Sequence, residues 1–237
     1  MTIVSSNTRA APAPDVGHAR RRTAHIDRAM VANRLRYGTI RTLDVVLCAI
    51  ALLFFAPLLA IIAIVVYLSD PGPILFAHRR LGRDGNHFYC LKFRSMVVDA
   101  EGRLRRLLDA DPVMRLEWER DHKLRVDPRI TRVGRFLRSS SLDELPQLWN
   151  VIRGDMSIVG PRPIVDAEVT RYGRYFNDYC RVRPGITGLW QISGRNDVSY
   201  RRRVALDVAF SRSTSVRLYL RILCLTVPSV LMARGSY

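Results

Sequence analysis

Two adjacent carboxylates, Asp143 and Glu144, stand in the segment SSSLDELPQLWNVIRGD. The backbone N–H groups at the start of a predicted helix favour anions, so both side chains are expected to be ionised. An ionised carboxylate can bind a metal ion or attack phosphorus. Arg135 and Arg138 closely precede the pair. Carboxylates flanked by arginines are what phosphoryl chemistry with a divalent cation needs, because positioning and charge neutralisation dominate that catalysis.

The same residues also fit a structural role. The run from Ser141 to Glu144 matches a capping box, in which Ser141 caps a helix and Glu144 reaches back to the backbone of Ser141. On the local pattern alone this structural interpretation is the favoured one. The sequence therefore leaves both roles open at this point.

Three further arginines stand beside turn residues. Arg162 lies between two prolines, and a rigid backbone reduces the entropy lost when its side chain binds an anion. A structural turn explains Arg162 equally well. Arg183 precedes Pro184-Gly185, and Arg195 follows Gly194. Arg183 and Arg195 are therefore also arginines next to predicted turns.

The composition indicates a polyanionic partner. The 237 residues include 38 Lys+Arg against 21 Asp+Glu, a formal charge of +17, and all but two of the basic residues are arginines. The planar guanidinium binds oxyanions bidentately, and such a charge suits nucleic acid, lipid headgroups or phosphorylated substrates. An apolar content of 48% excludes a wholly disordered chain. The four cysteines lie far apart, which argues against a zinc site or a disulfide framework.

The segment from Val45 to Leu68 holds 24 residues without a charge, and about 20 apolar residues suffice to cross a bilayer as a helix. Both flanks are rich in arginine, and positive residues prefer the cytoplasmic side, so a simple span would place one flank on the wrong side. Pro57 lies near the middle and is expected to kink the helix. The pattern favours a re-entrant helix. Lys92 and Arg94 follow this segment, and attraction to anionic lipid is one explanation for them.

The remaining pattern predicts an α+β fold that is mostly helical. It comprises a re-entrant membrane helix, a short β-hairpin and amphipathic interfacial helices around a cytoplasmic catalytic domain. The hairpin is expected from Ile74–His78 and His87–Phe93 around a turn at 82–85. Expected helices cover Val97 to Asp121 with a break near Asp111-Pro112, Thr131–Leu137, Leu142 to Ile152, and Val216–Met232.

Two segments rich in Gly and Pro, 154–163 and 183–197, are expected to be loops that carry function. The C-terminal helix fits an interfacial helix and a core-packing helix about equally well. The chain divides into a flexible basic tail over 1–36, a membrane helix over 37–70 broken near Pro57, and a catalytic domain over 71–237.

Taken in order, these pieces resemble the bacterial sugar transferases, which are monotopic phosphoglycosyl transferases acting on polyprenyl phosphate. The resemblance covers residues 40–237. It rests on the apolar run with Pro57 and on three segments: DPGPILFAHRRLGRDGNHFYCLKFRSM, DPRITRVGRFLRSSSLDELPQLWNVIRGDMSIVGPRP and RPGITGLWQISGRND. The closest similarity is to the hexose-1-phosphate transferases that begin O-antigen or exopolysaccharide assembly.

The resemblance implies a role for each matching residue. Asp143 matches the family's nucleophile and Glu144 its partner, and together they would hold Mg²⁺ against a diphosphate. The expected phosphate-binding side chains are Lys92, Arg94, Arg138, Arg162, Arg183 and Arg195. The family breaks its membrane helix at a Ser-Pro pair, whereas this chain has Ala56-Pro57.

The implied reaction has two steps at the cytoplasmic face of the inner membrane. Asp143 attacks the sugar-bearing phosphate of a UDP-hexose and displaces UMP, and polyprenyl phosphate then takes the phosphosugar from the aspartate. The alternative is a membrane-tethered nucleic-acid-binding protein, which the charge suggests, but the chain lacks a recognisable DNA-binding motif. The sequence leaves the hexose and the oligomeric state open.

Overall fold

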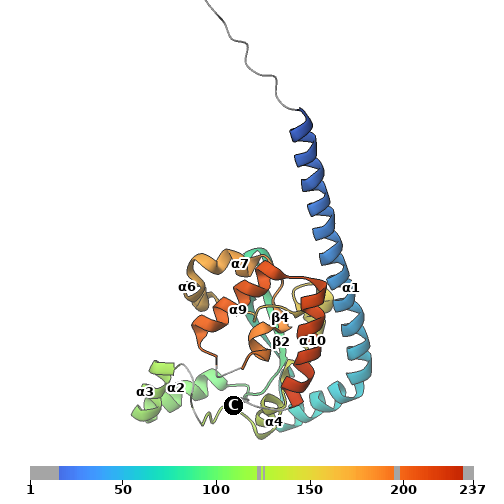
Figure 1. Ribbon diagram of the computed structural model, residues 1–237. Coiled ribbons are helices and arrows are strands. Elements are labelled where there is room, and N and C mark those ends of the chain that lie inside the picture. The colour runs from blue at the N-terminus through green and yellow to red at the C-terminus, as the bar shows by residue number, and fades with distance from the viewer. Residues whose placement is uncertain (1–15, 122–123, 125, 195–197, 232–237) are drawn as a thin grey trace, which may run out of the picture. The chain divides into compact units, whose positions relative to one another are not determined.

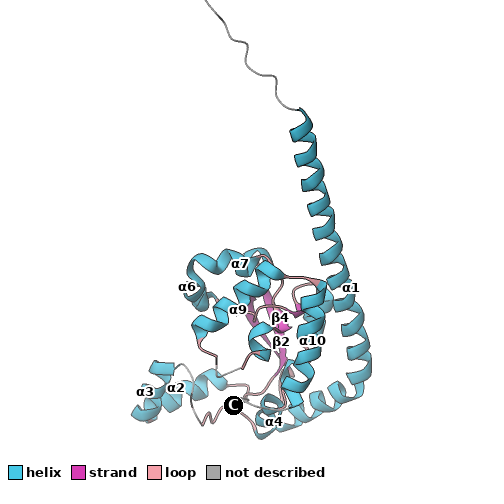
Figure 2. Ribbon diagram, viewed as in Figure 1, coloured by secondary structure: helices cyan, strands magenta, loops and turns pink. Residues whose placement is uncertain are grey.

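The computed structural model describes residues 16–121, 124, 126–194 and 198–231 (Figure 1). The described chain is mostly helical with two short pairs of strands, as Figure 2 shows, which confirms the predicted α+β class. It divides into two units, residues 1–39 and 40–237. The first unit contains the beginning of helix α1 (Val16–Ser69), and the second contains every other element described below.

Helix α1 contains the predicted membrane segment. Its part from Leu35 to Ser69 has a mean hydropathy of 3.0 and is long and apolar enough to cross a membrane. The helix continues through Pro57 instead of breaking there, and it bends in its second half (Figure 1). It begins at Val16, inside the range 1–36 expected to be a flexible tail. No proline occurs between Pro14 and Pro57, so no residue of that type interrupts the helix.

The second unit holds α1 by contacts on both sides of Pro57. Before the proline, Cys48 is buried in a cluster with Val151 and Met156. After it, Ile62 and Val66 pack with other buried residues in a second cluster. Between these contacts the helix exposes large apolar side chains, among them Leu53, which is 81% exposed. The helix is therefore fixed at two places with an apolar, uncovered stretch between them.

The predicted hairpin is confirmed. Strands β1 (Leu75–Leu81) and β2 (His87–Phe93) pair antiparallel, with Leu75 opposite Phe93 and Leu81 opposite His87. The turn between them contains the short helix η1 (Arg83–Gly85). The first strand runs three residues beyond its predicted end because Leu81 also pairs with Ile164 outside the hairpin.

The following helices match their predictions except at the carboxylate pair. The predicted break near Asp111 separates α2 (Ala100–Ala110) from α3 (Pro112–Asp121), and α4 (Arg132–Ser139) follows. The single helix expected from Leu142 to Ile152 is instead η2 (Leu142–Glu144) and α5 (Gln147–Arg153). Pro146 has no N–H to donate to the carbonyl of Leu142, so a continuous α-helix would lose a hydrogen bond there.

The two segments expected to be loops pair with each other. Strands β3 (Ser157–Val159) and β4 (Gly185–Thr187) form a parallel pair. A Cβ atom on Gly160 would lie 2.4 Å from the carbonyl oxygen of Arg183, so only glycine permits this approach. The remaining elements are η3 (Asp166–Glu168), α6 (Val169–Tyr172), η4 (Gly173–Tyr175), α7 (Phe176–Cys180), α8 (Leu189–Ile192), α9 (Tyr200–Ser213) and α10 (Val216–Leu231).

The C-terminal helix α10 packs in the core. Tyr219 and Ile222 are fully buried in a cluster that includes Val159 and Phe210. Arg217 and Arg221, the arginines that suggested an interfacial helix, are exposed. The core-packing interpretation therefore holds for one side of α10, while its arginines face solvent.

A buried carboxylate joins three of these elements. The Oδ1 atom of Asp44 in α1 accepts hydrogen bonds from the Ser157 hydroxyl at 3.0 Å, the Ile158 N–H at 2.8 Å and the Tyr219 hydroxyl at 2.8 Å. Asp44 is 1% exposed. Because a buried charge is tolerated only with such partners, this network ties α1, β3 and α10 together.

Replacing Tyr219 with Phe is expected to lower the free energy of unfolding by about 1.5–3 kcal/mol, the scale of one hydrogen bond to a charged group. The ring is retained, so the change removes one donor to Asp44 only. Chemical denaturation of the detergent-purified variant measures the effect. Tyr89→Phe is the matched control because Tyr89 is 60% exposed, and equal stability of the two variants would contradict the role given to Asp44.

Candidate active site

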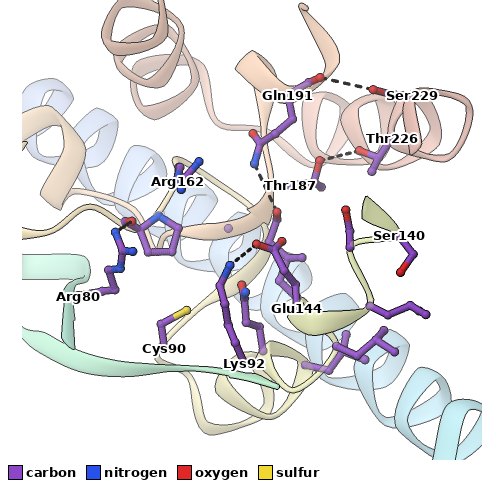
Figure 3. Close-up of a pocket in the computed structure, with 18 of the residues that line it drawn as sticks. Arg80, Cys90, Lys92, Ser140, Glu144, Arg162, Thr187, Gln191, Thr226 and Ser229 are labelled. Carbon is purple, nitrogen blue, oxygen red and sulfur yellow. Dashed lines mark hydrogen bonds and ion pairs between the residues drawn. The ribbon is translucent and has the colours of Figure 1, made fainter. Parts of the chain in front are cut away.

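A cavity of about 450 Å³ lies inside the second unit. Its walls come from the hairpin, from η2 and α5, from β4 and α8, and from α10. Figure 3 shows Lys92 and Glu144 in its centre, with Arg80 and Arg162 on one side and Ser140 on the other. Segments far apart in the sequence therefore meet around one space that holds both signs of charge.

The structure contradicts the capping-box interpretation of the carboxylate pair. Ser141 adopts a left-handed backbone conformation, with φ of 57°, and its side chain makes no capping hydrogen bond. The Glu144 carboxylate contacts Lys92 instead, with 2.5 Å between Nζ and Oε1. A non-glycine residue in this backbone region carries strain, and such residues cluster at functional sites. The turn at Ser141 directs the pair towards the hairpin.

Asp143 is the more enclosed member of the pair. Its residue is 8% exposed, and its Oδ2 atom lies 3.9 Å from Lys92 Nζ. Burial raises the pKa of Asp143 above its ordinary value and the Glu144 charge raises it further, whereas Lys92 and Arg138 lower it. The sequence predicted simple ionisation, but burial partly opposes the anion. Burial and the two neighbouring cations therefore act on this carboxylate in opposite directions.

Arg138 belongs to the surroundings of Asp143. Its Nε donates to the Ser95 hydroxyl at 2.8 Å. Burial lowers the pKa of Arg138, while the charge of Asp143 raises it. Arg138 therefore lies near Asp143, although neither residue is among those that line the cavity.

Arg162 supplies an exposed guanidinium to the cavity wall. Its Cζ lies 5.9 Å from the centre of the Trp190 ring, and no described carboxylate forms an ion pair with it. A guanidinium without a carboxylate partner keeps its bidentate face available for an incoming oxyanion. The structure thus places the Arg162 guanidinium at the cavity without a carboxylate partner among the described residues.

Two other arginines expected to bind phosphate have structural partners. The buried Arg94 guanidinium donates to the carbonyl of Asp70, just after α1 ends. Arg183 donates from Nε to the carbonyl of Gly154 at 2.8 Å, just after α5 ends. Each of these donors satisfies a carbonyl at a helix end, and neither residue is among those that line the cavity. Arg195 lies outside the described residues.

Sequence reasoning missed several cavity residues: Arg80, Gln147, Trp190 and Gln191. For Arg80 a signal was present, since residues opposite each other in an antiparallel pair share a face. Arg80 is opposite Phe88 in the hairpin. Every second pair lies on the same face, and the pairs two and four positions along are His78–Cys90 and Phe76–Lys92. Arg80 therefore shares a face with Lys92. Its Nη1 donates to the Pro163 carbonyl at 3.1 Å, and burial lowers its pKa. The other three residues come from segments whose positions depend on tertiary packing.

The donor set fits Mg²⁺ shared with a substrate. Among the described residues no cluster of three or more His, Cys, Asp or Glu side chains could hold a metal ion alone. Mg²⁺ is commonly held by one or two carboxylates together with substrate phosphates and water. Glu144 supplies one such carboxylate to the cavity wall, and Asp143, which is not among the lining residues, supplies a second one beside it, 3.9 Å from Lys92 Nζ.

A family model described as bacterial sugar transferase matches residues 35–233. The UDP-galactose-lipid carrier transferase of Erwinia amylovora is 49% identical over 197 residues, which are 83% of this chain and 41% of that protein. The exopolysaccharide production protein ExoY of Rhizobium meliloti is 48% identical over 197 residues, 83% of this chain and 87% of that protein.

The UDP-glucose:undecaprenyl-phosphate glucose-1-phosphate transferase of Caulobacter vibrioides is 40% identical over 205 residues, covering 83% of this chain and 71% of that protein. The chain thus spans less than half the length of the Erwinia relative and most of the length of the Rhizobium one. The family match includes the hairpin, the carboxylate pair and Arg162. By this match, the chain belongs to the bacterial sugar transferase family.

Proposed function

We propose that this protein transfers a hexose-1-phosphate from a UDP-hexose to polyprenyl phosphate and releases UMP. One observation carries the proposal: the Lys92–Glu144 ion pair lies in the wall of a cavity that Arg162 also lines, and the buried Asp143 lies 3.9 Å from Lys92 Nζ, between two lining residues in the sequence. The names of the related proteins, which include a UDP-sugar donor and an undecaprenyl-phosphate acceptor, support the substrate classes. The reaction begins an exopolysaccharide or O-antigen chain.

In the first step a carboxylate oxygen of Asp143 attacks the sugar-bearing phosphorus. A bond forms between that oxygen and phosphorus, and the bond from phosphorus to the bridging oxygen breaks, so UMP leaves with that oxygen. Lys92, Arg138 and Arg162 offset the charge that gathers on the phosphoryl oxygens. When bound by Asp143 and Glu144, Mg²⁺ supplies further charge neutralisation on the diphosphate.

In the second step an oxygen of polyprenyl phosphate attacks the phosphorus of the aspartyl phosphosugar. The bond from phosphorus to Asp143 breaks, which regenerates the carboxylate and releases polyprenyl diphosphate-sugar. A covalent intermediate suits these substrates because the soluble donor and the lipid acceptor need never be bound together. The acceptor would arrive along the membrane, near the exposed apolar stretch of α1 around Leu53 and Phe54.

We also propose that α1 enters and leaves the membrane on the cytoplasmic side. The helix bends in its second half, and the second unit binds it both before and after Pro57. A straight span would have to give up one of these two contacts. The arginine-rich flanks then both lie on the side that positive residues prefer.

Cysteine labelling in intact cells tests this topology. Ala10→Cys and the matched control Ala110→Cys, each in a chain without its native cysteines, are both expected to resist an impermeant reagent until the cells are permeabilised. Labelling of Ala10→Cys alone in intact cells would mean that α1 spans the membrane.

Replacing Asp143 with Asn is expected to lower turnover by several orders of magnitude, because the amide keeps the shape of the side chain but cannot act as the nucleophile. With UDP-sugar and Mg²⁺ but without acceptor, the native enzyme should release up to one equivalent of UMP and gain the mass of a sugar phosphate. The variant should do neither. Mass spectrometry and a UMP-release assay measure these results, and native-like turnover by the variant would refute the covalent mechanism.

Two further substitutions, one at Thr131 and one at Ser141, test the helix-cap alternative. Thr131→Ala removes a true cap, since its hydroxyl accepts from the Gly134 N–H at 2.8 Å, and should cost about 1 kcal/mol of stability. Ser141→Ala removes no capping hydrogen bond and should leave the stability nearly unchanged. A larger loss at Ser141 than at Thr131 would restore the cap interpretation.

Arg162→Lys is expected to reduce kcat/KM by about tenfold to a hundredfold while the protein stays folded, because lysine cannot reproduce the bidentate contact of a guanidinium with an oxyanion. The exposed Arg202→Lys is the matched control for the same change of side chain. Steady-state kinetics with a UDP-sugar measures the effect. If both variants retain native rates, Arg162 is only part of the turn between its prolines.

A further inference from the structure

Two buried amides stand three residues apart on α5 and differ in their surroundings. The Asn150 side chain is fully enclosed and fully partnered: its Oδ1 accepts from the Leu91 N–H at 2.9 Å and its Nδ2 donates to the Tyr89 carbonyl at 2.8 Å. Gln147 is almost as buried, at 3% exposed, but its side chain makes no hydrogen bond within the described chain. One amide is therefore tied to the hairpin by hydrogen bonds, and the other makes none within the described chain.

The Gln147 amide opens into the active-site cavity. Gln147 lines that cavity together with Glu144 and Lys92. Some side-chain nitrogen and oxygen atoms of the described chain have neither accessible surface nor a hydrogen-bond partner, and none of these atoms belongs to Gln147. Since Gln147 has no protein partner either, its amide atoms keep some accessible surface, and the cavity is the space that Gln147 lines. Buried polar groups are almost always hydrogen-bonded, so an amide left open in this way points to a ligand that completes it.

We propose that Gln147 binds the sugar-phosphate part of the donor through its side-chain amide, an inference that rests on the proposed function. Gln147 is the first residue of α5, three residues after Glu144 and four after Asp143. Its side chain therefore begins close to both carboxylates in the sequence. Its NH₂ group can donate to a phosphoryl oxygen or to a sugar hydroxyl. Its oxygen can accept only from a hydroxyl, because an ionised phosphate has no proton to donate.

An uncharged side chain suits position 147. A carboxylate there would add a third negative charge beside Asp143 and Glu144 and would repel the diphosphate. A lysine would compete with Lys92 for Glu144, which now lies 2.5 Å from Lys92 Nζ. An amide can contact the substrate without disturbing the ion pair, and it can distinguish hexoses that differ at a hydroxyl.

The experiment compares Gln147→Met and Gln147→Glu with Asn150→Asp as the matched control on the same helix. For each purified protein, kcat and KM are measured with UDP-glucose and with UDP-galactose, using undecaprenyl phosphate in detergent micelles, together with the melting temperature. Asn150→Asp should melt well below the native protein because it loses the donor to the Tyr89 carbonyl. Gln147→Met should melt at or above the native temperature, since it removes no hydrogen bond within the protein.

The expected result for Gln147→Met is a loss of about 10² in kcat/KM with a native-like fold, the scale of removing one donor from a reacting oxyanion. If Gln147→Glu loses as much with both donors, the amide binds a phosphoryl oxygen. If Gln147→Glu retains activity with one hexose and changes the ratio between the two, the amide binds a sugar hydroxyl. Both results support the proposal.

Native kcat/KM and native hexose preference in Gln147→Met would overturn the inference. A melting temperature lowered as far as that of Asn150→Asp would also overturn it, because the residue would then be structural. The wild-type protein in the same assay tests the proposed function separately. An inactive wild type would refute the transferase proposal and this inference with it, whereas an active wild type with an equally active Gln147→Met refutes the inference alone.

Discussion

The ion pair between Lys92 and Glu144 fixes the geometry on which the site depends. It joins a strand of the hairpin to the short helix η2, and these segments lie 52 residues apart in the sequence. Because Glu144 is held by the hairpin, Asp143 is turned towards the same lysine and stays within 3.9 Å of it. The left-handed backbone conformation of Ser141 allows the chain to bring Asp143 and Glu144 next to Lys92. Local backbone strain is thus retained where it places the carboxylate pair beside Lys92.

The second half of α1 and the elements around the cavity are parts of one packed structure. Asp44, inside α1, accepts hydrogen bonds from β3 and from α10, while residues after Pro57 pack near the hairpin and α4. The apolar helix is therefore integrated into the fold of the second unit. Its buried carboxylate helps to place the strand that leads into Arg162, so the position of α1 bears on the cavity wall that Arg162 lines.

Local signals predicted the hairpin, the break at Asp111 and the carboxylate pair, because each depends on residues that are neighbours in the sequence. The capping box failed because Glu144 finds a stronger partner in Lys92, which no local pattern reveals. Arg94 and Arg183 were predicted to bind phosphate, and in the structure each donates to a backbone carbonyl just after a helix end. An arginine near a turn has the same sequence pattern in either role, and only the fold shows which acceptor it meets.

The close packing of Gly160 against the segment from Arg183 to Gly185 has a consequence for how this protein can vary. Any side chain at Gly160 would collide with the opposing backbone, and a Cβ atom on Gly185 would lie 2.1 Å from the Gly160 nitrogen. Substitutions in the two segments cannot therefore be independent. Arg162 follows the first segment and Trp190 the second, so a side chain added at either glycine would push two walls of the cavity apart.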